Sequence, residues 1–150
     1  MSRKGIRPEI WLLVALVLLI GLAVAAKWWW WQVPPVIAIT APAGQFTKVE
    51  MWEEGISESG EPRSLANGRA EYPAEYGRHF VKVTLADQRA CTFLYAHSDA
   101  GVRRKVTIHL EQLAKDRCRA QIWFNGFGQG SVEFDPALTA DHPVILPPHH

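Results

Sequence analysis

The chain has 150 residues, 16 of them Lys or Arg and 15 Asp or Glu, which gives a formal net charge of +1 at pH 7. After residue 31 the balance is 12 basic against 14 acidic residues, which excludes the concentrated positive charge that nucleic-acid binding requires. About 115 residues follow the N-terminal apolar segment, a length typical of one domain.

The first predicted element is a membrane-spanning helix. Residues 10–26 carry no charge and no proline, and they run into the sequence KWWWW at residues 27–31. A helix over residues 10–31 is about 33 Å long, which matches a hydrocarbon core about 30 Å thick. Four consecutive tryptophans point to all sides of a helix, which suits the bilayer–water interface and not a packed soluble core. We therefore expect an interfacial band made of Lys27, Trp28, Trp29, Trp30 and Trp31.

The charges that flank this segment predict its orientation. Arg3, Lys4 and Arg7 precede it, whereas only Lys27 follows before Lys48. Because an excess of Lys and Arg stays in the cytoplasm, we expect residues 1–9 inside and the C-terminal domain outside. In a bacterium this is a single-pass inner-membrane protein with a periplasmic domain. The alternative is a cleaved signal peptide, which the basic start and the AVAA at residues 23–26 fit, although the apolar run exceeds the usual core of about 7–15 residues.

The start of the chain also resembles a type IV prepilin. In MSRKG followed by IRPEIWLLVALVLL, a short basic leader ends in glycine and precedes an apolar helix with an early glutamate. The resemblance covers only this segment and implies cleavage before Ile6 and a pilin-like structural subunit. The sequence departs from the pattern at three points. Glu9 would be the fourth mature residue instead of the fifth, Arg7 and Pro8 interrupt the apolar start, and Pro34-Pro35 end the helix too early for a pilin stalk.

Apolar and polar residues alternate with a period of two in much of the remaining chain, which predicts β-strands. Expected strands cover residues 36–40, 46–52, 79–86, 90–97, 102–110, 117–124 and 131–134. Residues 53–77 are rich in turn formers and predict a long loop with one short strand, and residues 110–117 predict one or two helical turns. We expect an all-β domain over residues 37–146, a small antiparallel β-sandwich or barrel, after a linker at 32–36 and before a tail at 147–150.

The alternation also assigns side chains to faces. The inward set in the strands 102–110 and 117–124 is Val102, Arg104, Val106, Ile108, Leu110, Cys118, Ala120, Ile122 and Phe124. Cys91 is expected to face inward from the strand 90–97. Because the predicted topology places the domain in an oxidising compartment, we expect a disulfide between Cys91 and Cys118. Closing this loop would stabilise the domain by roughly 3.5 kcal/mol in the chain-entropy model.

No motif predicts catalysis, a cofactor or a metal. His97-Ser98-Asp99 has the residue types of a hydrolytic triad, but adjacent residues cannot face one another. NGFGQG at residues 125–130 lacks the helix and the Lys-Ser/Thr of a phosphate-binding loop. The six histidines show no metal-binding spacing, and the carboxylates of residues 53–75 fall in a loop-like region without an apolar pocket. We therefore expect no catalytic residue, no cofactor and no metal site.

Charge and aromatic residues favour a protein-binding surface. Residues 49–76 have a net charge of −5 and residues 77–119 a net charge of +5. The residues expected on outward strand faces, or at the adjacent turn, are Arg103, Lys105, Arg117, Arg119, Trp123 and Phe127. Since Arg and Trp are common at interface hot spots, the leading hypothesis is an accessory subunit of an envelope complex, or an inhibitor or immunity-type protein, that binds a partner at the membrane. The alternative is a small anchored hydrolase or glycan-binding enzyme that uses carboxylates brought together by the fold.

Overall fold

The computed structural model describes residues 7–97 and 104–147 and divides the chain into two units, Met1–Val33 and Pro34–His150. The first unit is a single helix, α1 (Pro8–Gln32), none of whose residues is buried. Pro8 lies in the first turn, where its missing N–H costs no hydrogen bond, and Val33 is extended ahead of Pro34. α1 contains the whole predicted span and is long and apolar enough to cross a membrane.

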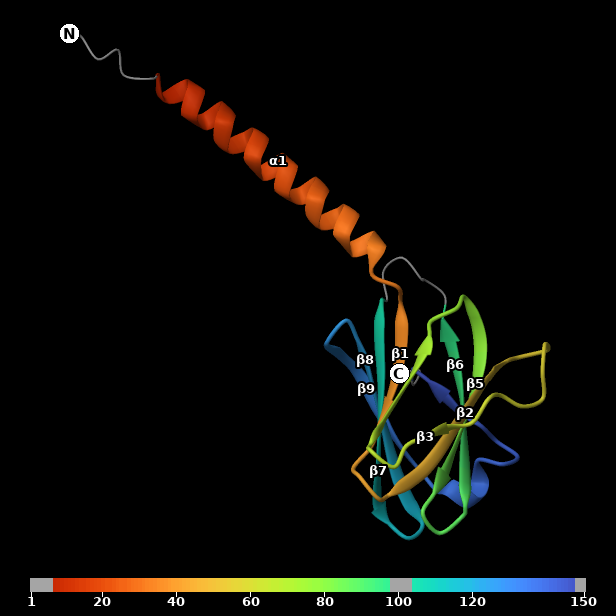
Figure 1. The fold of residues 1–150 in the computed structure, drawn as a ribbon. Coiled ribbons are helices and arrows are strands. Elements are labelled where there is room, and N and C mark those ends of the chain that lie inside the picture. Colours follow the sequence, from red (N-terminus) through yellow and green to blue (C-terminus); the bar gives the residue numbers. More distant parts are fainter. Residues whose placement is uncertain (1–6, 98–103, 148–150) are drawn as a thin grey trace. The chain divides into compact units, whose positions relative to one another are not determined.

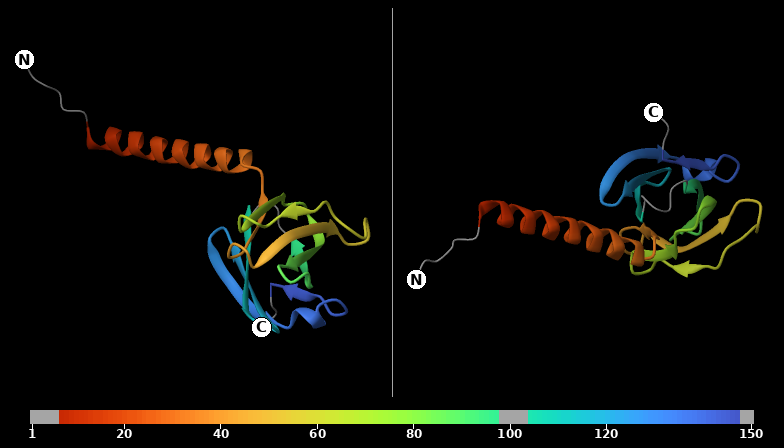
Figure 2. Two further views of the ribbon diagram at one scale, coloured as in Figure 1. Left: turned by 60° about the horizontal axis from the view of Figure 1, so that its bottom comes forward. Right: turned by 90° about the horizontal axis from the view of Figure 1, so that it is seen from above.

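The second unit is a sandwich of two five-stranded sheets, shown in Figure 1 and from two further directions in Figure 2. Sheet A contains, in spatial order, β4 (Arg69–Pro73), β1 (Val36–Thr40), β7 (Lys105–Ala114), β8 (Arg117–Phe124) and β9 (Phe127–Phe134). Sheet B contains β10 (Val144–Leu146), β6 (Ala90–His97), β5 (Gly77–Leu85), β2 (Phe46–Glu53) and β3 (Arg63–Ser64). A short 3-10 helix, η1 (Pro136–Leu138), lies between β9 and β10.

Alternate residues of the two sheets pack into one hydrophobic core. The positions of β7 and β8 with no exposed surface are Val106, Ile108, Leu110, Cys118, Ala120 and Ile122. Across the sandwich, Phe93 of β6 meets Phe134 of β9 edge to face, with ring centroids 5.1 Å apart. The predicted faces of β7 and β8 are confirmed over their described residues. Arg104, which interrupts the apolar face in the sequence, is itself buried.

The predicted antiparallel architecture is wrong in one respect, because each sheet contains a parallel pair. β1 pairs parallel with β7, and β10 pairs parallel with β6. In both pairs, strands of the other sheet lie between the two paired strands in the sequence. The paired strands are therefore not joined by a tight hairpin, which would require an antiparallel direction. The two sheets are not joined into a closed barrel, so of the two predicted alternatives the domain is a sandwich.

Three local predictions also differ from the structure. Residues 110–117 do not form helical turns, because β7 continues to Ala114 and pairs with β8 through a β-bulge. The predicted loop at 53–77 contains two short strands, β3 and β4, where one was expected. β9 begins at Phe127, earlier than predicted, because Asn125 and Gly126, both at positive φ, complete a two-residue hairpin turn.

Candidate functional site

The predicted binding surface centres on Trp123, on the outer face of sheet A. Trp123 pairs with Thr107 of β7, and 41% of its surface is exposed. Its ring lies against Gly128 of β9, where an added Cβ would be 3.4 Å from the indole. A shallow pocket of about 350 Å³ beside it is lined by Thr40, Lys105, Thr107, His109, Gln121, Trp123 and Gly126. We call these seven residues the Trp123 patch.

Hydrogen bonds on both sides of the Trp123 patch hold its shape. The Thr40 hydroxyl and His109 Nδ1 are 3.0 Å apart, which ties β1 to β7. Asn125 of the hairpin turn accepts from the Lys105 amide through Oδ1 at 3.0 Å and donates its own amide to the Lys105 carbonyl at 2.7 Å. The Lys105 backbone is therefore anchored, and its exposed side chain lies at the edge of the pocket.

Of the arginines expected on this surface, Arg117 and Arg119 lie on the same outer face of β8 as Trp123, but farther along the strand and outside the pocket. Arg119 Nη2 lies 2.7 Å from Glu133 Oε1 and Nη1 lies 4.0 Å from Glu111 Oε2, so acidic side chains of both neighbouring strands already engage it. This contact raises the pKa of Arg119 and lowers the pKa of Glu133, chiefly through the side-chain hydrogen bond. Arg117 lies at the other end of β8, in a shallow pocket shared with Asp116, Glu133 and Asp135. Arg103 is outside the described residues.

Phe127, expected at the adjacent turn, directly follows that turn, but its side chain does not share a face with Trp123. Phe127 pairs with Phe124, and directly opposed residues of an antiparallel pair point to the same side of the sheet. Phe124 is a core residue, so Phe127 projects from the core side, beyond the end of the packed interior, with 74% of its surface exposed. The residues of the predicted surface therefore form the Trp123 patch, the Arg119 ion-pair cluster farther along the same face, and an isolated Phe127.

The two cysteines lie in opposite sheets, both pointing into the core as predicted. Cys91 belongs to β6 and Cys118 to β8, and neither has exposed surface. Both are free thiols, so the predicted disulfide is absent from the structure. Burial strongly raises the pKa of Cys91 and raises the pKa of Cys118 to about 11, which makes both thiols poor nucleophiles near neutral pH.

The outer face of sheet B carries an apolar row that the sequence-based expectations do not include. Trp52, Phe80, Leu94 and Ile145 are aligned across four neighbouring strands by the pairs Trp52–Phe80, Phe80–Leu94 and Leu94–Ile145. The Trp52 and Phe80 rings stack with centroids 5.7 Å apart. The sequence does contain a signal for this row. In the alternation of residues 79–86, Phe80 occupies an outward position like Lys82. An aromatic in the polar phase indicates an exposed apolar surface.

A groove of about 890 Å³ lies beside this row. Its floor contains Trp52 and Phe80 together with Lys82 and Thr92. Ser57 and Glu58 form one wall, and the segment between β9 and β10, from Pro136 to Pro143, contributes the other. Thr139 fixes that segment, because its hydroxyl accepts from the Thr92 amide at 3.0 Å. The floor holds two aromatic rings and the second wall is mostly proline and alanine, while Ser57, Glu58 and Lys82 add polar groups, which suits an apolar side chain with polar neighbours.

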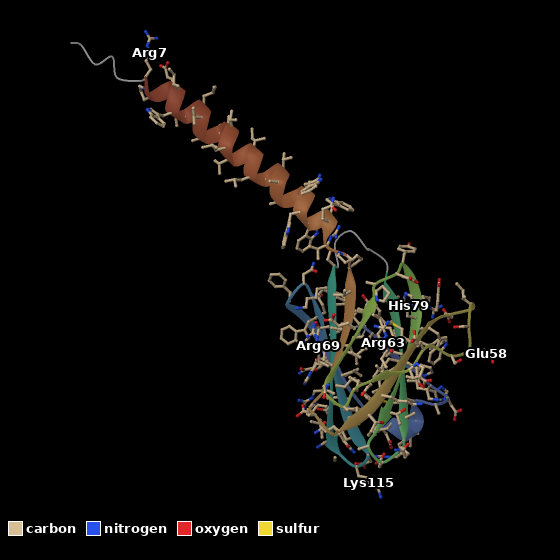
Figure 3. The ribbon with its side chains drawn as sticks, viewed as in Figure 1. Arg7, Glu58, Arg63, Arg69, His79 and Lys115 are labelled. Carbon is tan, nitrogen blue, oxygen red and sulfur yellow. The ribbon has the colours of Figure 1, made fainter. Side chains whose placement is uncertain are left out.

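A smaller pocket of about 240 Å³ gathers polar residues at the β3 side of sheet B. The Tyr72 hydroxyl donates to the Val49 carbonyl at 2.9 Å, and the Arg63 guanidinium lies 4.3 Å from the centre of its ring. Burial raises the pKa of Tyr72 to about 12. His79 Nε2 lies 3.0 Å from the Glu75 carbonyl oxygen; Figure 3 labels Arg63 and His79. These contacts tie β2, β3 and β4 together, which is a structural role.

The residues that the structure describes include no group of three or more His, Cys, Asp or Glu side chains arranged to hold a metal ion. Comparison with protein-family models, with curated proteins and with solved structures finds no match for this chain. The functional assignment therefore depends on the surfaces described above.

Proposed function

We propose that the protein is a membrane-anchored protein-binding module. α1 spans the bacterial inner membrane with the N-terminus in the cytoplasm, and the β-sandwich lies in the periplasm. Its partner is another envelope protein, in the membrane or at its surface, which suits an accessory subunit of an envelope complex or an inhibitor or immunity-type protein. The apolar length of α1 and the basic residues before it favour this arrangement.

The observation that carries the binding function is the Trp123 patch. A tryptophan that presents part of its ring beside a concave, polar-lined pocket provides a large apolar contact with directional groups around it. Lys105 adds an exposed positive charge at the edge, which favours an acidic group on the partner. The apolar row of sheet B is a second exposed surface of the kind found at protein interfaces.

The test is crosslinking in native membranes followed by purification of the full-length protein. Trp123→Ala and Lys105→Glu should each remove the partner that the unaltered protein captures. Arg117→Glu is the matched control, because Arg117 is also exposed on β8 but lies outside the patch, and it should keep the partner. Retention by both patch variants, with their thermal unfolding checked, would show that this face does not bind.

Topology needs a separate measurement. A reporter enzyme that works only outside the cytoplasm should be active when it is fused after His150, and the fusion should remain in membranes after an alkaline wash. An inactive reporter would reverse the proposed orientation. A shortened, soluble product would show cleavage near Ala25 and would replace the anchor with a signal peptide.

A further inference from the structure

The most exposed large apolar side chains of the β-sandwich occur in turns or directly beside them, where a monomer gains nothing from them. Among its described residues these are Ile56, Tyr76 and Phe127, with 74%, 71% and 74% of their surfaces exposed. They belong to three different connections, the turn after β2, the turn between β4 and β5, and the start of β9. We call these three residues the apolar rim.

All three connections leave strands at the end of the sandwich where β1 begins; in Figure 1 the β4–β5 and β8–β9 turns lie toward the upper end, and the loop after β2 projects to the side. The Ala74 amide donates to the Pro35 carbonyl at 2.9 Å, which places the Tyr76 turn beside the entry of the chain. Val36 pairs with Lys105, whose backbone bonds Asn125 of the turn that leads to Phe127. The Glu54 amide donates to the Arg78 carbonyl at 2.9 Å, which brings the Ile56 turn to the start of β5.

The covalent connection holds this end of the sandwich close to the end of α1. Three residues, Val33, Pro34 and Pro35, separate Gln32 from Val36. Four Cα–Cα steps span at most about 14 Å, so Val36 stays within that distance of Gln32 for any angle between the two units. Two consecutive prolines also make the connection stiff. Gln32 directly follows the four tryptophans of the predicted interfacial band.

We propose that the apolar rim inserts into the interfacial region of the lipid bilayer and docks the sandwich on the membrane surface. The proposal rests on the membrane anchoring of α1. Aromatic and aliphatic side chains on the protein surface gain free energy at the headgroup–acyl boundary, and tyrosine can keep its hydroxyl among the headgroups. The tether supplies the proximity, so the rim needs no strong affinity of its own.

The charges around the apolar rim favour apolar insertion over electrostatic attraction. Glu53, Glu54 and Glu75 lie in the same turns or next to them, and the exposed Lys105 lies beside the turn that leads to Phe127. Arg78 Nη1 lies 2.9 Å from Glu54 Oε2, so this arginine is already paired within the protein. Because acidic side chains around the rim outnumber the basic ones, the rim has little electrostatic attraction for anionic headgroups. The docking should therefore occur on uncharged phosphatidylcholine and need no anionic lipid.

The test uses the full-length protein reconstituted into phosphatidylcholine vesicles. Ile56→Cys, Tyr76→Cys and Phe127→Cys are each labelled with a fluorophore that shifts to the blue in an apolar environment. Cys91 and Cys118 are buried, so the folded protein takes the label at the introduced cysteine. The matched control is Leu138→Cys. Leu138 is 66% exposed and follows β9 at the end opposite Phe127, roughly 23 Å farther along the strand.

The expected result is a blue shift, and several-fold weaker quenching by aqueous iodide, at all three rim positions and not at Leu138. Lipids with a nitroxide near the headgroup should quench the rim labels selectively. Rim labels as accessible to iodide as the control label would overturn the proposal, as would protection that appears only with phosphatidylglycerol or with a partner protein. Co-flotation of the protein with the vesicles reports the anchor separately, so a failed anchor is distinguishable from an undocked sandwich.

Discussion

Replacing Ile122 by alanine should destabilise the sandwich strongly, because Ile122 has no exposed surface in the centre of β8. The substitution removes three carbon atoms, whose transfer out of water is worth about 2.4 kcal/mol at about 0.8 kcal/mol per methylene. Close-packed neighbours collapse only in part around the cavity, which adds a further cost. We expect a total loss of about 3–4 kcal/mol in the free energy of unfolding.

The matched control is Ile145→Ala, the same substitution on β10 at a position that is 51% exposed. It should cost less than about 1 kcal/mol, because less apolar surface and no enclosed cavity are involved. Thermal unfolding of the full-length protein in mild detergent, followed by the circular dichroism of the sheets, measures both. At roughly 4 °C per kcal/mol for a domain of this size, Tm should fall by about 12–16 °C for Ile122→Ala. Equal losses for the two variants would refute the assignment of these strand faces.

Three other predictions address the thiols, one glycine and one ion pair. Cys91 and Cys118 should resist alkylation at pH 8 in the reduced, folded protein and react when it is unfolded. Protein taken from the native membrane and unfolded without reductant tests the predicted disulfide: unmodified cysteines would show that it forms in the cell, and two modified thiols would rule it out. Gly60→Ala should destabilise by roughly 1–3 kcal/mol, measured by urea unfolding, because its Cβ would lie 2.0 Å from the Met51 carbonyl oxygen; a neutral effect would contradict this close approach. Because pairing with Arg119 lowers the pKa of Glu133, this ion pair stabilises the fold above about pH 4.3, and the stabilisation is lost as the pH falls. Glu133→Gln should therefore make the loss of stability at acidic pH slightly less steep. An unchanged pH dependence would show that the pair contributes nothing.

The helix and the strand faces follow from the sequence because their causes are local. An uncharged run of residues 10–26 between Pro8 and Pro34-Pro35 favours one long helix whatever surrounds it. In β7 and β8 the period-two alternation places every second side chain on the core side, so the burial of Ile108 and Ile122 needed no knowledge of the partner strands. The same logic placed Trp123 outside.

Strand partners and surface composition were decided by tertiary structure, because they depend on contacts between distant residues. The parallel pairing of β1 with β7 follows from chain crossings between sheets that no local pattern encodes. Arg119 lies on the outward face that the alternation predicts, but its ion pair with Glu133 of β9 depends on a strand pairing that the alternation does not show. A two-residue turn places Phe127 opposite Phe124, on the core side. The connections that carry Ile56, Tyr76 and Phe127 are far apart in the chain but leave the same end of the sandwich, because strands from both sheets terminate there, and sequence spacing carries no record of that arrangement.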